Sequence, residues 1–173
     1  GRQSLIDQFK IYPDDEARER VTLEQGDIFK TVRRMIKRRR QFDVIAVFGI
    51  FYHITEHYEL LALLKQLRPN LILIDSQFML AKAPMVQFAL EDPEKDLNSI
   101  SRSHGQDRTM IGTPSRRWMD MAASTLGYDT HWANWTELPE ERRASVVDYY
   151  RMKFKRRDTV ALCPQSPEIE PET

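Results

Sequence analysis

Two short apolar runs, each bounded by turn-forming residues, constrain the fold of this chain more than any other feature. Phe42 to Phe48 is apolar on both alternating sides and ends at Gly49, and Leu71 to Ile74 lies between Pro69-Asn70 and Asp75. A run of this kind is typical of a strand that is buried on both faces of a sheet. We therefore expect both runs to be interior strands.

The residues between the two runs repeat with the period of a helix. Tyr58, Leu61, Leu64 and Leu67 recur at helical spacing, and Thr55 stands where an N-cap residue is expected. A helical crossover between buried strands is the connection that a parallel sheet requires. The order strand, helix, strand therefore predicts an α/β fold.

The same alternation precedes the first run. Val21 to Glu24 is a short extended candidate that is followed by Gly26-Asp27, and the next residues carry apolar side chains at helical spacing. We expect a strand over 21–24 and a helix over 28–40, for which Asp27 is a suitable N-cap.

After the second run the alternation pauses. Residues 76–113 are mostly polar and contain Pro84 and Pro93, so we predict a substrate-side insertion over 78–113. A helix then opens at Pro114-Ser115 and ends at Gly127. The remaining predictions are a strand over 130–135, a basic amphipathic helix over 142–157, a strand over 159–163 and a disordered tail over 164–173. Residues 1–163 would belong to one domain and make up its C-terminal two-thirds.

Composition removes several classes of protein. Lysine and arginine number 26 and aspartate and glutamate also number 26, so no overall field attracts a polyanion. Two basic clusters, in 30–40 and 142–157, stay open as phosphate-binding surfaces or as solvated helix faces. The single cysteine, Cys163, excludes an intramolecular disulfide and a cysteine-based zinc site and favours a reducing compartment, hence a cytoplasmic location. No apolar run approaches the roughly 20 residues of a membrane span.

The order of these motifs resembles a known family. Val21 to Phe29 is similar to the third strand and Gly-Asp turn of a Rossmann-like S-adenosylmethionine (SAM) methyltransferase. Phe42 to His53 resembles the fourth strand and the loop after it, and Pro69 to Phe78 the fifth strand. The Gly-apolar-apolar-Tyr-His element at 49–53 and the Pro-Ser helix ending in Gly127-Tyr128 are similar to the tRNA wobble-uridine methyl- and carboxymethyl-transferases. The resemblance implies SAM as cofactor and a small molecule as substrate, with tRNA as a further candidate.

The chain also departs from that family. The glycine-rich loop after the first strand and the acidic residue that ends the second strand are not in this sequence, and Gly1-Arg2 resembles the residues just after that acid. In the family, strands one and two lie between strands three and four. We therefore expect Val44–Phe48 to have an open apolar edge, which another chain or a preceding segment would complete.

The resemblance assigns roles to five residues. Asp27 would accept a hydrogen bond from the adenine amine of SAM and Ile28 would pack on the ring, although Asp27 also suits a helix cap. Gly49 would contact the cofactor in the ligand crevice, or simply form a tight turn. Tyr52 would contact the carboxyl end of the cofactor or the substrate, or only pack. His53 would serve as general base where the acceptor carries a proton, because imidazole titrates near neutrality.

Three further interpretations stay open. The run His53-Ile54-Thr55-Glu56-His57 matches an inverted zinc-peptidase signature, but a helix start between the two imidazoles would make them diverge. The insertion offers polar candidates for substrate binding, of which Arg102, His104 and Arg108 are the ones we single out. The alternative to an enzyme is a non-catalytic remnant that keeps the scaffold as an interaction module.

Overall fold

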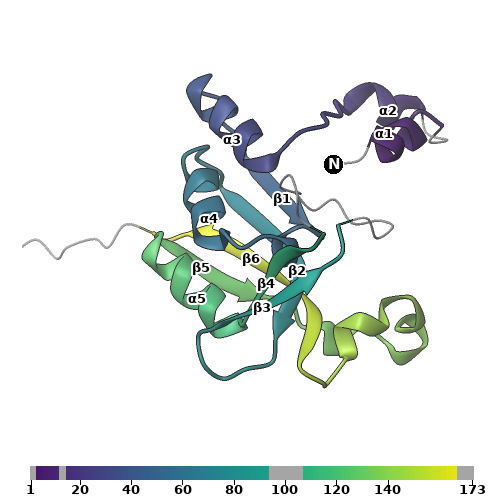
Figure 1. Cartoon of the computed structure of the whole chain (residues 1–173), viewed down its shortest axis with the longest axis vertical. Coiled ribbons are helices and arrows are strands. Elements are labelled where there is room, and N and C mark those ends of the chain that lie inside the picture. Colours follow the sequence, from purple (N-terminus) through teal and green to yellow (C-terminus); the bar gives the residue numbers. More distant parts are fainter. Residues whose placement is uncertain (1–2, 12–14, 94–106, 167–173) are drawn as a thin grey trace, which may run out of the picture.

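The computed structural model describes residues 3–11, 15–93 and 107–166, and its centre is a four-stranded sheet (Figure 1). The strands run in the order β1-β2-β6-β5. Their bounds are β1 (Val44–Phe48), β2 (Leu71–Met79), β5 (Tyr128–Trp132) and β6 (Lys155–Pro164). β1 and β2 are parallel, whereas β6 is antiparallel to both of its neighbours. The predicted α/β class is confirmed, and the sheet is mixed because its last strand reverses direction.

Three helices support the sheet. They are α3 (Ile28–Lys37), α4 (His57–Lys65) and α5 (Arg116–Thr125), and the shorter α1 (Gln3–Phe9) and α2 (Asp15–Arg20) precede them. Leucines of α4 and small residues of α5 share one buried cluster with alternate residues of β2 and β6, such as Ile72 and Val160. One face of each of these strands therefore meets the helices, as period-two burial requires.

Local sequence explains two of the helix ends. Ser115 caps α5 because its hydroxyl accepts a hydrogen bond from the backbone N–H of Trp118 at 3.1 Å. Gly127 follows the helix with a φ of +75°, the left-handed conformation that glycine adopts most easily. These are the start and the stop that the sequence predicts.

The predicted insertion contains regular structure that the sequence analysis did not foresee. β2 continues to Met79, and β3 (Val86–Glu91) and β4 (Thr109–Pro114) pair as an antiparallel hairpin. The backbone N–H of Gly112 in β4 donates to the carbonyl of Ile54 at 3.1 Å. The hairpin is thereby fixed against the loop that follows β1.

Three local predictions are wrong. Val21–Glu24 is not a strand but an exposed segment between α2 and α3. Residues 142–157 do not form one helix; the short 3₁₀ turns η3 (Glu140–Arg142) and η4 (Ala144–Tyr150) are followed by an irregular segment over 151–154 and then by β6. Thr55 is not the cap of α4, because His57 is the first helical residue and Glu56 occupies the cap position without a side-chain hydrogen bond.

β1 lies at the edge of the sheet, as the sequence predicts, but it is not buried on both faces. Val44 is 53% exposed and Phe48 is 61% exposed, while Val47 is buried. Within the described residues β2 is its only strand neighbour. The predicted tail lies largely outside these residues, and its first member, Pro164, ends β6.

No helix in the described part of the chain has the length and apolar character needed to cross a membrane.

Candidate functional site at the carboxyl end of β1

The chain turns sharply where β1 ends. Gly49 has a φ of +70°, and its backbone N–H donates to the carbonyl of Asp75 in β2 at 3.0 Å. A Cβ built on Gly49 would meet only the guanidinium of Arg157, at 3.7 Å. The carboxyl end of β1 therefore offers a bare backbone, the kind of surface to which a ligand can approach closely.

The short helix η1 (Phe51–His53) follows this turn and is anchored by its first residue. Phe51 is fully buried, and its ring lies edge-on to the ring of His57, with centroids 4.9 Å apart. Because Phe51 is fixed in the core, the next two side chains, Tyr52 and His53, are held over the end of the sheet.

Tyr52 and His53 lie together. Their ring centroids are 4.0 Å apart, and Nδ1 of His53 is 3.2 Å from a carboxylate oxygen of Glu91 in β3. A carboxylate at one ring nitrogen fixes the orientation of an imidazole, as in known acid–base sites. Burial raises the pKa of the Tyr52 hydroxyl, and the charge of Arg157 opposes this rise. Tyr52 is therefore a neutral hydrogen-bonding group at physiological pH.

A second group of polar residues surrounds Asp75. Its carboxylate accepts hydrogen bonds from Tyr149 Oη at 2.6 Å, Arg157 Nε at 2.5 Å and Thr159 Oγ1 at 2.7 Å. Burial is the main cause that raises the pKa of Tyr149, and the hydrogen bond to Asp75 raises it further. The hydroxyl therefore keeps its proton and donates it to the carboxylate in a hydrogen bond. Burial acts to lower the pKa of Arg157, but the hydrogen bond and charge of Asp75 outweigh it and raise that pKa. Asp75 thus ties η4 and β6 to β2 beside the Gly49 turn.

The structure places the predicted site residues in three different ways. Gly49, Tyr52 and His53 come together at the end of β1. Asp27 and Ile28 lie on another element, where Asp27 caps α3 by accepting the Lys30 backbone N–H at 2.9 Å and Ile28 packs against the core. Of the substrate candidates, Arg108 is exposed just before β4, and Arg102 and His104 lie outside the described residues.

The zinc-peptidase interpretation is contradicted by the position of His57. This side chain is 2% exposed, and its Nε2 is 3.0 Å from the carbonyl oxygen of Gly112. His53 belongs to η1 and His57 to α4, so the two residues do not share one helix. The described ranges contain no group of three potential metal ligands.

Sequence reasoning missed Glu91, Asp75, Tyr149 and Arg157. Asp75 had a signal, because a polar residue directly follows an apolar run that ends near the carboxyl edge. Tyr149 and Arg157 had none, because their contact with Asp75 depends on the pairing of β2 with β6, in which Asp75 faces Thr159. Glu91 had none because it reaches His53 only through the β3–β4 hairpin.

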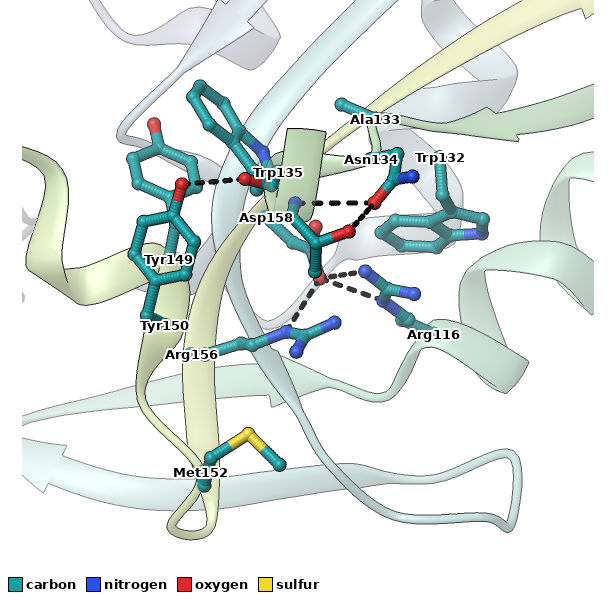
Figure 2. Close-up of a pocket in the computed structure, with 11 residues that line it drawn as sticks. Arg116, Trp132, Ala133, Asn134, Trp135, Tyr149, Tyr150, Met152, Arg156 and Asp158 are labelled. Atoms are coloured by element: carbon teal, nitrogen blue, oxygen red, sulfur yellow. Dashed lines mark hydrogen bonds and ion pairs between the residues drawn. The ribbon is translucent and has the colours of Figure 1, made fainter. Parts of the chain in front are cut away.

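A cavity of about 330 Å³ adjoins this group on the side of α5 and β6 (Figure 2). Tyr149 belongs to both places, since its ring lines the cavity and its hydroxyl reaches Asp75. The other principal lining residues are Arg116, Trp132, Trp135, Arg156 and Asp158.

Comparison with known proteins identifies the fold. A scan against protein-family models and a search of curated proteins each found no match. Among solved structures, the N-terminal domain of EvdMO1 with S-adenosylhomocysteine (SAH) bound superposes with a TM-score of 0.66 at 14% identity, covering 95% of this chain. The glycopeptide N-methyltransferase MtfA complexed with SAH gives a TM-score of 0.50 at 11% identity, covering 94% of this chain and 68% of its own.

The chain spans 63% of the EvdMO1 domain, so it matches a part of that structure. At these identities the likeness concerns the fold. The predicted Rossmann-like methyltransferase architecture is confirmed, while the tRNA wobble-uridine grouping stays a prediction. What the comparisons establish is that this chain has an α/β fold that occurs in methyltransferases.

Proposed function

We propose that the protein is a SAM-dependent methyltransferase whose donor site lies at the carboxyl end of β1. The observation that carries the proposal is the bare Gly49 turn with Tyr52 and His53 above it, in a fold that two SAH-bound proteins share. When bound, SAM supplies an electrophilic methyl group on a sulfonium. The backbone at Gly49 is open to such a ligand, because a Cβ there would meet nothing closer than 3.7 Å.

The residues of the turn would hold the donor. Gly49 lets the ligand approach the backbone, and the protonated hydroxyl of Tyr52 offers a hydrogen bond to a carboxylate. Asp27 and Ile28 are the proposed adenine contacts, and Asp27 would combine this role with its cap of α3. Holding donor and acceptor in line is the main contribution that a protein makes to such a displacement.

His53 is the proposed general base. It would take the proton that an O–H or N–H acceptor loses as that atom bonds to the methyl carbon. Glu91 is a positioning residue, because its carboxylate lies 3.2 Å from Nδ1 of His53. His53 and Glu91 are 12% and 22% exposed, so water has limited access to this pair.

The basic clusters are not a reason to propose tRNA as the substrate. Within 30–40, Arg33 pairs with Glu59 and Arg34 pairs with Glu24, as expected for a solvated helix face. We propose a small molecule as the methyl acceptor. We also propose a cytoplasmic location, because Cys163 is a free cysteine.

Calorimetry with SAH on the full-length protein tests the donor site. We expect saturable binding that Gly49→Val weakens by at least tenfold, since a branched side chain at a positive φ both strains the turn and fills the space. The matched control is Gly127→Val, which changes another positive-φ glycine outside the site. Absence of SAH binding, or equal affinity in both variants, would overturn the proposal.

Turnover measurements test the role of His53 as general base. With SAM and a panel of phenol and amine acceptors, His53→Gln should lower kcat by roughly 10²–10⁴-fold without changing SAH affinity. Glu91→Gln should lower kcat less and leave KM unchanged, while Glu59→Gln, which alters an exposed ion pair, should behave as wild type. If His53→Gln keeps full kcat, the histidine is structural. Absence of turnover by the wild-type protein would instead favour a scaffold that only binds partners, a role with which the open edge of β1 is consistent.

A further inference from the structure

The cavity beside Tyr149 has the size of a small-molecule site. Its volume of about 330 Å³ is at the lower end of the ~300–1,000 Å³ that ligand pockets occupy. In Figure 2, Arg116 and Arg156 reach the Asp158 carboxylate from two sides, with Trp132 beside Arg116 and Trp135 on the opposite side. The cavity therefore combines charged groups and flat aromatic surfaces within a small volume.

The charges of the wall favour an anion. Arg116, Arg156 and Asp158 are the charged residues that line the cavity, so two guanidiniums face one carboxylate. Oδ2 of Asp158 accepts from Arg116 Nε at 2.7 Å, from Arg116 Nη2, and from Arg156 Nε at 3.1 Å. Asp158 is 1% exposed, whereas the side chains of Arg116 and Arg156 are 34% and 26% exposed. The guanidiniums can thus reach a ligand while the carboxylate holds them in place.

The aromatic walls favour a planar ring. The guanidinium of Arg116 lies 4.6 Å from the centroid of the Trp132 ring, and the rings of Trp135 and Tyr149 are in contact at a tilt of 35°, with centroids 4.0 Å apart. Tilted and guanidinium-covered aromatics of this kind present flat surfaces to a ligand.

Two buried polar atoms in the same wall lack partners among the described residues. They are Oδ1 of Asp158, an acceptor, and Nε1 of Trp135, a donor. Buried polar atoms are nearly always hydrogen-bonded in native proteins, so this wall carries polar groups that no described residue satisfies.

We propose that this cavity binds a small aromatic carboxylic acid through its carboxylate, as a site separate from the donor site. Arginine forks suit carboxylates because two parallel N–H groups match the two oxygens. The ring would lie against Trp132 and Trp135. Tyr149 forms the wall between the cavity and the donor site through its bond to Asp75.

Tryptophan fluorescence provides the test, because two of the three tryptophans, Trp132 and Trp135, line the cavity. The probes are 4-hydroxybenzoate and its neutral counterpart 4-hydroxybenzyl alcohol, titrated into full-length protein without SAM or SAH. We expect saturable quenching by the acid and at least tenfold weaker binding of the alcohol. Arg156→Gln should weaken binding of the acid by at least tenfold, and Arg156→Lys should weaken it less.

Arg117→Gln is the matched control, since it removes an exposed charge from the same helix as Arg116 and should leave affinity unchanged. Circular dichroism verifies that each variant is folded, and Trp135→Phe, which keeps a ring but loses the N–H, tests the same cavity independently. The proposal would be overturned if the acid and the alcohol bound equally or if the acid caused no quenching. It would also be overturned if Arg117→Gln lost as much affinity for the acid as Arg156→Gln, or if uridine monophosphate bound more tightly than the acid. SAH calorimetry runs separately, so loss of the donor site is not confused with loss of this one.

Discussion

At the scale of single residues, one side chain can serve stability and ligand binding at once, and Asp27 is the clearest case. Its carboxylate caps α3 by accepting the Lys30 backbone N–H at 2.9 Å. The proposed adenine contact would use the same carboxylate, whose two oxygens can accept several hydrogen bonds. A substitution that keeps the helix cap but shortens the side chain therefore separates the two roles.

Asp27→Ala and Asp27→Ser separate these roles. Alanine should cost about 1 kcal/mol of stability through loss of the cap, and serine should restore most of it because serine also caps helices well. If Asp27 also holds adenine, both variants should lose SAH affinity, since the serine hydroxyl is too short to reach the ligand. Thermal unfolding and calorimetry on the same samples give the two measurements. Unchanged SAH affinity in both variants would leave Asp27 as a cap alone.

At the scale of elements, the hairpin and α4 meet around one buried imidazole. His57 opens α4, contacts the ring of Phe51, and has Nε2 3.0 Å from the carbonyl oxygen of Gly112 in β4. A Cβ on Gly112 would come within 2.7 Å of Cε1 of His57, so the close approach of hairpin and helix depends on glycine. This contact holds the hairpin, and Glu91 with it, over η1.

His57 should make stability depend on pH. Burial lowers its pKa from the ordinary value of 6.5, with hydrogen bonds to carbonyls opposing this in part. The folded protein therefore binds fewer protons than the unfolded chain between the lowered pKa and 6.5, so the free energy of unfolding falls as pH falls through that window. The slope is at most about 1.4 kcal/mol per pH unit for one group.

Urea unfolding at pH 7.5 and at points down to pH 5.5 measures this dependence. His57→Gln should be less stable at pH 7.5 and should show a smaller slope. His131→Gln, in the partly exposed strand β5, is the matched control and should keep the slope of the wild type. The same slope in the His57 variant would mean that other groups cause it.

Particular residues show how far sequence reasoning reached. The apolar runs before Gly49 and Asp75, the cap at Ser115 and the stop at Gly127 are local signals, and the structure confirms each of them. In β3, Val86, Phe88 and Leu90 alternate with less apolar residues, a period-two signal that was readable but lay within an apparent loop.

Residues 142–157 could not be predicted from their spacing. Basic residues at helical intervals favour a helix, but Tyr149 and Arg157 are drawn to Asp75, about eighty positions away in the chain. Such a contact depends on the pairing of β2 with β6, which no local pattern contains. The Asp75 group and the cavity beside it are therefore properties of the tertiary structure.

At the scale of the whole molecule, the sheet ends at β1, whose outer edge has no strand partner among the described residues. β1 exposes Val44 and Phe48 and has a single strand neighbour among the described residues. An edge of this kind can accept a strand from another chain, and natural proteins often protect it with lysine. We propose that a strand from a further segment or chain covers this edge in the working protein.

The purified chain of 173 residues should accordingly self-associate as its concentration rises. Val44→Lys should shift sedimentation toward monomer, because a charge on the edge opposes pairing. Met121→Lys is the control, since Met121 is 52% exposed on α5, away from the edge. A wild-type chain that stays monomeric over a wide concentration range, or an equal effect of both variants, would contradict the prediction.

The alternation of side chains along β6 has a consequence for how this protein can change. Arg157 and Thr159 bond to Asp75, while Arg156 and Asp158, on the other face of the same strand, line the cavity. Adding or deleting one residue in β6 would exchange the two sets and ruin both sites together. Substitutions can alter either face separately, so the strand should tolerate changes of residue type but not of length, and variation in length belongs to the turns on either side of it.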